Sequence, residues 1–192
     1  VCEDSYLIVL EKVLSAIGPK TKAIVPVHLF GNVVDIERLR AIVGRNIYII
    51  EDACQAHGSS MNKRKSGSFG DIGCFSFYPT KNLGGYGDGG AIITNNHDLY
   101  NKIKLMRMYG MRDKDHVEIH GMNSRLDEIQ AAILSVKLRY LDKFNHQRNL
   151  IAKKYISGLS NELFSHQRIL KNTFSNYHVF QSRYAGDRNS LM

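Results

Sequence analysis

Short apolar runs alternate with amphipathic stretches along the first half of the chain. The runs are rich in β-branched residues, as is typical of buried strands, and they cover residues 23–27, 47–50, 72–77 and 91–94. Between the first two runs, Ile36, Leu39 and Ile42 recur at the spacing of one helix face. Near-continuous apolar strands separated by helices predict an α/β fold with a mainly parallel sheet flanked by helices.

The second half begins with a long helical pattern. Apolar residues recur at helical spacing from Leu126 to Phe144, and Ser124 is positioned to cap this predicted helix. Acidic residues just after Ser124 favour the positive end of a helix. Residues 149–163 predict a further helix, and residues 176–184 predict a strand that has no partner within the chain.

Length and composition indicate a packed globular protein. The chain has 192 residues, of which 43% are hydrophobic and 23% charged. We expect residues 1–150 to be part of a large domain, and residues 151–192 to be a linking helix and the start of a small C-terminal domain. Val1 follows no initiator Met and no secretory signal opens the chain, so we expect truncation at both ends. No apolar run approaches the ~18–20 residues of a membrane-spanning helix, so no membrane association is expected.

Net charge and cysteine usage indicate which partners, metal sites and cellular compartment to expect. The net charge is +8, but the basic residues are dispersed, with the densest cluster at residues 63–65. We interpret that cluster as a solvated loop; attraction of phosphorylated, anionic substrates is the alternative, and no nucleic-acid partner is expected. Cys2, Cys54 and Cys74 are odd in number and lack metal-ligand spacing, which predicts no metal site and a reduced, cytoplasmic setting.

Two acidic residues end the second predicted strand. Glu51 and Asp52 follow the apolar run at residues 47–50. Ligands of open α/β sheets bind at the carboxyl ends of strands. An acid there can cap a helix, bind a metal or pair with a cationic ring nitrogen, and from these residues alone a structural role is favoured.

Lys81 lies in a turn just past the third predicted strand and just before a glycine run. Most lysines are solvated. A lysine held between a strand end and a glycine turn, near a buried acid, is a candidate for Schiff-base chemistry, because desolvation or nearby cations favour the nucleophilic free amine. Ser76 lies at the end of the same strand and is a candidate phosphate ligand.

The glycine run contains a formal GxGxxG pattern at residues 85–90. A dinucleotide-binding fingerprint must follow a strand and open a helix. This pattern instead precedes the strand predicted at residues 91–94. We therefore expect the glycines to allow close backbone packing around Lys81.

Several short motifs follow one another in a fixed order. They are PVHLFG at 26–31, DACQAHG at 52–58, FSF at 75–77, KNLG at 81–84, GGA at 89–91, GMNSR at 121–125 and QAA at 130–132. Each motif is weak alone, but in this order they closely resemble the DegT/DnrJ/EryC1/StrS family of pyridoxal-phosphate-dependent sugar aminotransferases. The resemblance implies a truncated large domain of the aspartate-aminotransferase type, known as fold type I. It runs from about residue 20 to about residue 159.

The resemblance also implies roles for matching residues. Lys81 would carry pyridoxal 5'-phosphate as a Schiff base and move protons. Asp52 would pair with the pyridinium nitrogen, which keeps the ring an electron sink. Gln55 would bond the ring's phenolic oxygen, and Ser76 the phosphate. Asn123 would reach a phosphate in the neighbouring subunit of a homodimer.

Other residues keep open alternatives. Arg125 is a candidate for binding an anionic substrate. His28 and His57 are candidate substrate contacts, although structural histidines are the favoured interpretation. Asn123 precedes Ser124 at a predicted helix N-terminus, where an anion is favoured. The alternative is that Asn123 ends a loop and bonds its own backbone.

The implied reaction is a ping-pong transamination from an amino acid, expected to be glutamate, to a keto sugar, expected to be nucleotide-linked. Two rivals remain. Family members that dehydrate deoxysugars with the same cofactor have histidine at the lysine position, whereas residue 81 is Lys. A non-catalytic regulator on the same fold would have little reason to keep Asp52, Gln55, Ser76 and Lys81 together.

Overall fold

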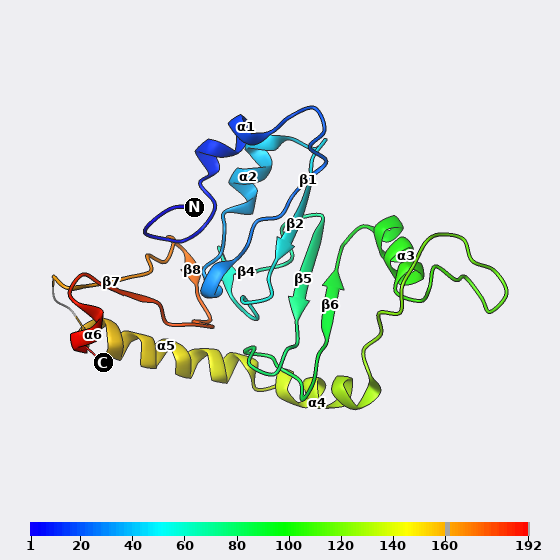
Figure 1. Ribbon diagram of the computed structural model, residues 1–192. Helices are drawn as coiled ribbons and strands as arrows, with labels where there is room; N and C mark the ends of the chain where they lie inside the picture. Colours follow the sequence, from blue (N-terminus) through cyan, green and yellow to red (C-terminus); the bar gives the residue numbers. More distant parts are fainter. Residues whose placement is uncertain (160–161, 192) are drawn as a thin grey trace.

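A four-stranded sheet forms the centre of the molecule (Figure 1). The computed structural model describes residues 1–159 and 162–191. In sheet order, the strands are β1 (Ala23–Ile24), β2 (Tyr48–Asp52), β5 (Ile72–Ser76) and β6 (Gly90–Ile93). The first three are parallel, and β6 is antiparallel to β5. The predicted α/β fold and mainly parallel sheet are confirmed.

One end of the sheet is covered by the N-terminal helices. These are η1 (Leu10–Lys12), α1 (Val13–Ala16) and α2 (Ile36–Val43), and a short turn η2 (Leu29–Gly31) precedes α2. Asp35 caps α2 by accepting the N–H of Arg38 at 2.9 Å, and Gly44 ends it with a φ of +71°. The helices and β2 share one apolar core, formed by Leu7, Leu10, Val13, Val34, Ile36, Leu39 and Ile49.

Two small antiparallel sheets flank the central one. The first has the order β4 (Arg64–Lys65), β3 (Ser60–Met61), β8 (Thr173–Phe174). The second pairs β7 (Phe164–His166) with β9 (Ser182–Tyr184), and α6 (Arg188–Leu191) follows. The strand predicted at 176–184 forms only over its last three residues. The prediction that it lacks a partner is wrong, because β7 pairs with it.

The helices of the second half differ from the prediction. They are α3 (His97–Met106), α4 (Glu128–Leu138) and α5 (Leu141–Gly158). The N-cap of α4 is Asp127, so the prediction that Ser124 caps the helix is wrong. The apolar spacing continues through Tyr140, but the N–H groups of Arg139 and Tyr140 bond carbonyls three residues back, which tightens and ends α4. Neither Gly nor Pro marks this break in the sequence.

The long helix α5 runs from α4 past the end of the central sheet to the β7–β9 pair (Figure 1). The domain boundary predicted at residue 150 falls within it, and the division into two domains remains a prediction. Over residues 1–159 and 162–191, no helix is long and apolar enough to cross a membrane.

Three buried asparagines, Asn82, Asn145 and Asn176, join α5 and the C-terminal segment to the sheet; we call them the asparagine cluster. The Asn82 amide donates to Asn145 Oδ1 at 2.8 Å and to the carbonyl of Asn176 at 3.0 Å. Asn145 and Asn176 each donate to the carbonyl of His57, at 2.8 and 3.1 Å. Asn82 follows Lys81, so this cluster anchors the lysine turn to two distant segments.

We predict that Asn145→Ala in the full-length protein lowers the free energy of unfolding by about 1–3 kcal/mol, because buried polar partners lose a hydrogen bond. Asn101→Ala, on an exposed position of α3, serves as the matched control and should change it by about 0.5 kcal/mol or less. Denaturant titration measures both. Equal stability of the two variants would show that the asparagine cluster does not anchor α5.

Candidate active site

Asp52 ends β2, and both of its backbone polar groups bond the segment that follows β1. Its N–H donates to the Pro26 carbonyl at 2.9 Å, and its own carbonyl accepts the N–H of His28 at 3.0 Å. Its side-chain Oδ1 accepts the N–H of Cys54 at 3.0 Å. In the sheet, Asp52 lies opposite Cys74 of β5. The carboxylate is therefore fixed at the carboxyl edge of the parallel strands, where sequence analysis expects a ligand.

Gln55 is oriented by a single backbone contact. Its Oε1 accepts the N–H of Phe30 at 2.8 Å, and Phe30 adopts a left-handed φ of 60°. Because this bond occupies the amide oxygen, the amide NH₂ group remains available to donate a hydrogen bond to a ligand. Gln55 thus presents a donor, as a bond to an anionic oxygen requires.

Lys81 lies in the turn after β5, half-buried, with its N–H bonded to the Tyr78 carbonyl at 2.9 Å. The turn is compact enough to require glycine. A Cβ on Gly84 would lie 2.5 Å from the Pro79 carbonyl oxygen, closer than any real contact. The glycines therefore allow close backbone packing beside Lys81, as predicted.

The Cys54 thiol lies beside Asp52, whose Oδ1 accepts the Cys54 N–H, and its pKa responds to the charges of both Asp52 and Lys81. The pKa of Cys54 is raised to about 12, chiefly by burial and next by Asp52, while the Lys81 charge opposes the rise. Burial and Asp52 also raise the pKa of Cys74. Both thiols therefore stay protonated and uncharged at pH 7.

Two neutral histidines contact the asparagine cluster that follows Lys81. Burial lowers the pKa of His57 and of His178 to about 4, and the Lys81 charge contributes to both shifts. His57 packs against Phe75, with ring centroids 5.3 Å apart. The Nδ1 of His178 lies 3.1 Å from Asn82 Oδ1 in the asparagine cluster.

His178 was missed by sequence analysis. The pattern around it predicts a strand, but residues 175–181 form no strand and place His178 against Asn82, the residue after Lys81. Its backbone N–H bonds both the Phe30 carbonyl, at 3.1 Å, and Asn176 Oδ1, at 3.0 Å. No local pattern signals contacts over so long a sequence separation.

Ser76 lies on the same face of the sheet as Asp52. Side chains alternate along a strand, so Ser76 and Cys74 share a face, and Cys74 pairs in register with Asp52. The Ser76 hydroxyl accepts the N–H of Tyr78 at 3.3 Å. Its position fits the predicted phosphate contact, which remains a prediction.

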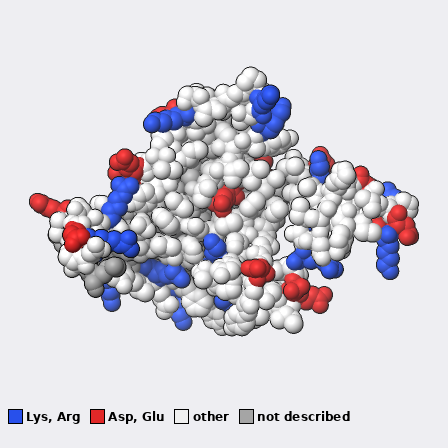
Figure 2. All heavy atoms as spheres, viewed as in Figure 1, with Lys and Arg blue, Asp and Glu red and all other residues white. Residues whose placement is uncertain are grey.

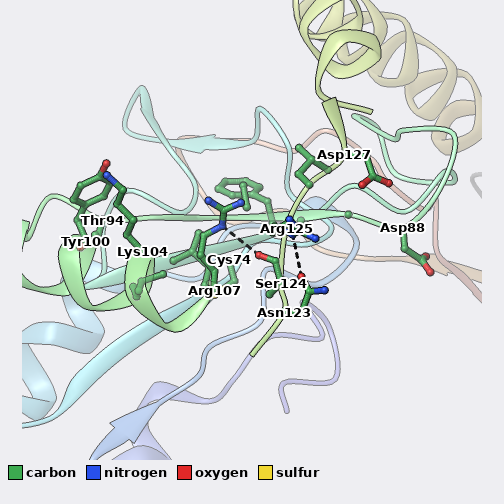
Figure 3. A pocket seen from close by; sticks show the side chains of 17 residues that line it. Cys74, Asp88, Thr94, Tyr100, Lys104, Arg107, Asn123, Ser124, Arg125 and Asp127 are labelled. Carbon is green, nitrogen blue, oxygen red and sulfur yellow. Dashed lines mark hydrogen bonds between the residues drawn. The ribbon is translucent and has the colours of Figure 1, made fainter. Parts of the chain in front are cut away.

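A groove of about 1010 Å³ runs beside β6 and α3 (Figure 3). It borders Cys74, but Asp52, Gln55, Ser76 and Lys81 do not line it. Its polar lining comes from the end of β6, from α3 and its C-cap and from the segment before α4, and includes Thr94, Tyr100, Lys104, Arg107, Asn123, Ser124, Arg125 and Asp127. The groove adjoins the site without being the site.

Asn123 and Arg125 face each other in this groove (Figure 3). The Arg125 Nε donates to Asn123 Oδ1 at 3.1 Å, and both side chains are exposed. The prediction that Asn123 lies at a helix N-terminus is wrong, because α4 begins at Glu128. Asn123 instead forms an isolated β-bridge with Met108. With its oxygen bonded to Arg125, its amide presents donors only, which still suits an anion.

Charge is dispersed over the surface. On the face in Figure 2, Lys and Arg are interspersed with Asp and Glu and form no continuous basic surface. The 63–65 cluster is exposed, but it is not a simple loop, because Arg64–Lys65 form β4. Within the part of the chain that the structure describes, no group of three or more His, Cys, Asp or Glu residues is arranged to hold a metal ion.

The donor set fits the cofactor that the family resemblance implies. An acid suits a ring nitrogen, the Gln55 amide suits a phenolic oxygen, and Ser76 suits a phosphate. Lys81, the one amine among these groups, lies in the turn that follows Ser76. The four residues come from adjacent parallel strands and the loops after them, so one ring can contact all of them only at this edge of the sheet.

Comparisons with known proteins agree with this geometry. The DegT/DnrJ/EryC1/StrS aminotransferase family matches residues 1–192. A dTDP-3-amino-3,4,6-trideoxy-alpha-D-glucose transaminase of Streptomyces venezuelae is 46% identical over 146 residues, covering 76% of this chain and 38% of that protein. A pleiotropic regulatory protein of Geobacillus stearothermophilus is 45% identical over 170 residues, covering 88% and 46%.

A solved structure agrees as well. Streptomyces venezuelae DesV, in complex with a ketimine intermediate, superposes with a TM-score of 0.93 at 40% identity. The match covers 99% of this chain and 52% of DesV, so the chain spans about half the length of this relative. The expected fold class is confirmed. Because the family match extends over the whole chain, this protein belongs to the DegT/DnrJ/EryC1/StrS aminotransferase family.

Proposed function

We propose that the full-length protein is a pyridoxal-phosphate-dependent aminotransferase that moves an amino group from an amino acid, glutamate, to a keto sugar carried on a nucleotide. The placement of Asp52 and of the Lys81 turn at the shared carboxyl edge of the parallel strands β2 and β5 carries this proposal. The transaminase name of the Streptomyces relative supports the sugar substrate. When bound, the cofactor supplies an electron sink for carbanion chemistry.

The residues of this chain divide the remaining work. The Asp52 carboxylate would pair with the ring nitrogen and favour the protonated form of that nitrogen. The Gln55 amide donates to the phenolic oxygen, and the Ser76 hydroxyl contacts the phosphate. Lys81 would hold the cofactor through its Nζ, and the same amine would take up and return the proton at the reacting carbons. His57 and His178 are neutral at pH 7, so they do not compete with Lys81 for an anion.

We further propose a homodimer in which each site uses residues of both subunits. Asn123 and Arg125 lie in the groove and do not share a lining with Lys81. Their donors therefore serve a phosphate or an anionic substrate held by the partner subunit. The three free thiols suit a reduced compartment, and we place the protein in the cytoplasm.

A regulatory role is the second candidate, because one relative is named as a pleiotropic regulator. The retention of Asp52, Gln55, Ser76 and Lys81 around one edge favours catalysis. Lysine at position 81 favours amination over the dehydration expected of family members with histidine there.

Borohydride reduction of the full-length protein should fix the cofactor irreversibly to Lys81, because only an imine between the two is reduced to a stable bond. Peptide mapping by mass spectrometry locates the label. The Lys81→Ala protein should carry none. A label on a peptide that lacks Lys81 would overturn the assignment.

Asp52→Asn should lower kcat by about 100-fold or more, because breaking a buried charge pair costs about 3–5 kcal/mol. The amide keeps the shape and can still accept the Cys54 N–H. Asp98→Asn, at an exposed position of α3, is the control and should retain normal turnover. Steady-state kinetics measure both, and near-normal turnover by a folded Asp52→Asn protein contradicts the role.

Subunit sharing predicts complementation between two weak variants. Mixed full-length Lys81→Ala and Asn123→Asp proteins form hybrid dimers with one site that bears both defects and one that bears neither. Activity should rise toward one quarter of the wild-type value on statistical exchange. Exchange verified by mass spectrometry without any recovery would mean that Asn123 serves its own subunit or no site.

A further inference from the structure

A buried carboxylate sits beside Asp52 in the sequence but on the opposite face of β2. Side chains alternate along a strand, so Glu51 points into the core while Asp52 points to the candidate site. The side chain of Glu51 is 0% exposed. The proposed catalytic scheme gives this charge no role, although a buried charge is costly and needs partners.

Glu51 is bonded at both oxygens. Its Oε2 accepts the N–H of Gly67 at 2.7 Å and lies 2.8 Å from His28 Nε2. Its Oε1 accepts the N–H groups of Phe69 at 2.6 Å and Gly70 at 2.5 Å. Burial by itself would raise the pKa of Glu51, but these hydrogen bonds outweigh it and leave the pKa below its usual value. The group is therefore an ionised, fully bonded carboxylate.

His28 links the Glu51 carboxylate to a third segment; we call Glu51, His28 and the backbone groups bonded to them the Glu51 network. Its Nδ1 accepts the N–H of Val34 at 3.0 Å, so Nε2 carries the proton that is donated to Glu51. The side chain of His28 is also 0% exposed. This arrangement agrees with the interpretation of His28 as a structural histidine and excludes contact with substrate through its ring.

The segments that Glu51 joins are the ones that border Asp52. On one side, the backbone of His28 bonds the Asp52 carbonyl. On the other, the loop containing Gly67 lies against β5, where a Cβ on Gly73 would be 2.1 Å from the Gly67 carbonyl oxygen. Gly73 pairs with Glu51 and precedes Cys74, the register partner of Asp52. The Glu51 carboxylate thus holds the two segments on either side of the end of β2: the one that contains His28 and the loop that contains Gly67.

We propose that Glu51 and His28 are positioning residues, which hold Asp52 and the start of β5 so that the Asp52 carboxylate meets the cofactor's ring nitrogen. This inference rests on the proposed function. It predicts that damage to the network weakens the Asp52–ring pair even when the fold survives. By analogy with residues that orient metal ligands, the loss is expected to be about 10–100-fold in affinity or activity.

The test uses the full-length protein with Glu51→Gln, which keeps the shape but turns an NH₂ group toward donors. Glu37→Gln is the control, since the Glu37 side chain is 61% exposed on α2. Three quantities are measured: the dissociation constant of the cofactor from the apoprotein, the pH midpoint of the absorbance change of the bound cofactor, and kcat. The midpoint reports the electrostatics of Asp52, which a loss of global stability alone does not move.

For Glu51→Gln we expect a shifted midpoint, a weaker cofactor complex and a kcat lowered by about 10-fold or more, with Glu37→Gln unchanged. Because Glu51→Gln can fail to fold, His28→Gln is made in parallel. It keeps the three backbone bonds to Glu51 and a donor near Oε2, and it should shift the midpoint in the same direction by less.

The outcomes separate the two proposals. Wild-type protein that binds no cofactor overturns the proposed function itself. Wild-type protein that binds it normally, with variants that match its midpoint and kcat while only their melting temperatures fall, overturns the positioning role. If Glu51→Gln does not fold, an unshifted midpoint in folded His28→Gln overturns it equally.

Discussion

The parallel pairing of β2 with β5 is the constraint on which the rest of this structure depends. The register sets Asp52 beside Cys74 and brings the turn that holds Lys81 to the same edge of the sheet. The carboxyl ends of parallel strands lie at the same edge of a sheet, so Asp52 and Lys81, about thirty positions apart in the sequence, are brought to one edge by the strand pairing itself. The buried Glu51 carboxylate joins the segments on both sides of this pair.

The second organising element is polar and links distant parts of the chain. The asparagine cluster joins the residue after Lys81 to α5 and to the segment that carries His178. Buried amides of this kind contribute little to stability unless all of their hydrogen-bond partners are in place. The lysine turn therefore depends on contacts made by residues that lie more than sixty positions away in the sequence.

The sequence predicted the parts of the fold that depend on local pattern. Four strands, α2 and the glycine turn beside Lys81 follow from periodicity and backbone sterics, and the motifs around Asp52 and Lys81 lie at one edge as expected. What failed depended on tertiary contacts. The cap at Ser124 and the strand over 176–184 look regular locally, but the chain bends there to make long-range contacts. The helix predicted through Tyr140 ends instead in local hydrogen bonds three residues back, which the apolar spacing does not signal. The roles of His178 and of the Glu51 network were invisible for the same reason.

The central claim is that this edge of the sheet performs an amino-group transfer, and the first half of that reaction isolates it. Full-length protein loaded with pyridoxal 5'-phosphate is mixed with glutamate and no sugar, and the 2-oxoglutarate released is quantified. The account predicts about one equivalent per site, followed by no further release, because the amino group stays on the protein until a keto substrate arrives. Absence of 2-oxoglutarate when cofactor-loaded protein is mixed with glutamate, and of the corresponding 2-oxo acid when it is mixed with each other amino acid in turn, would contradict the account.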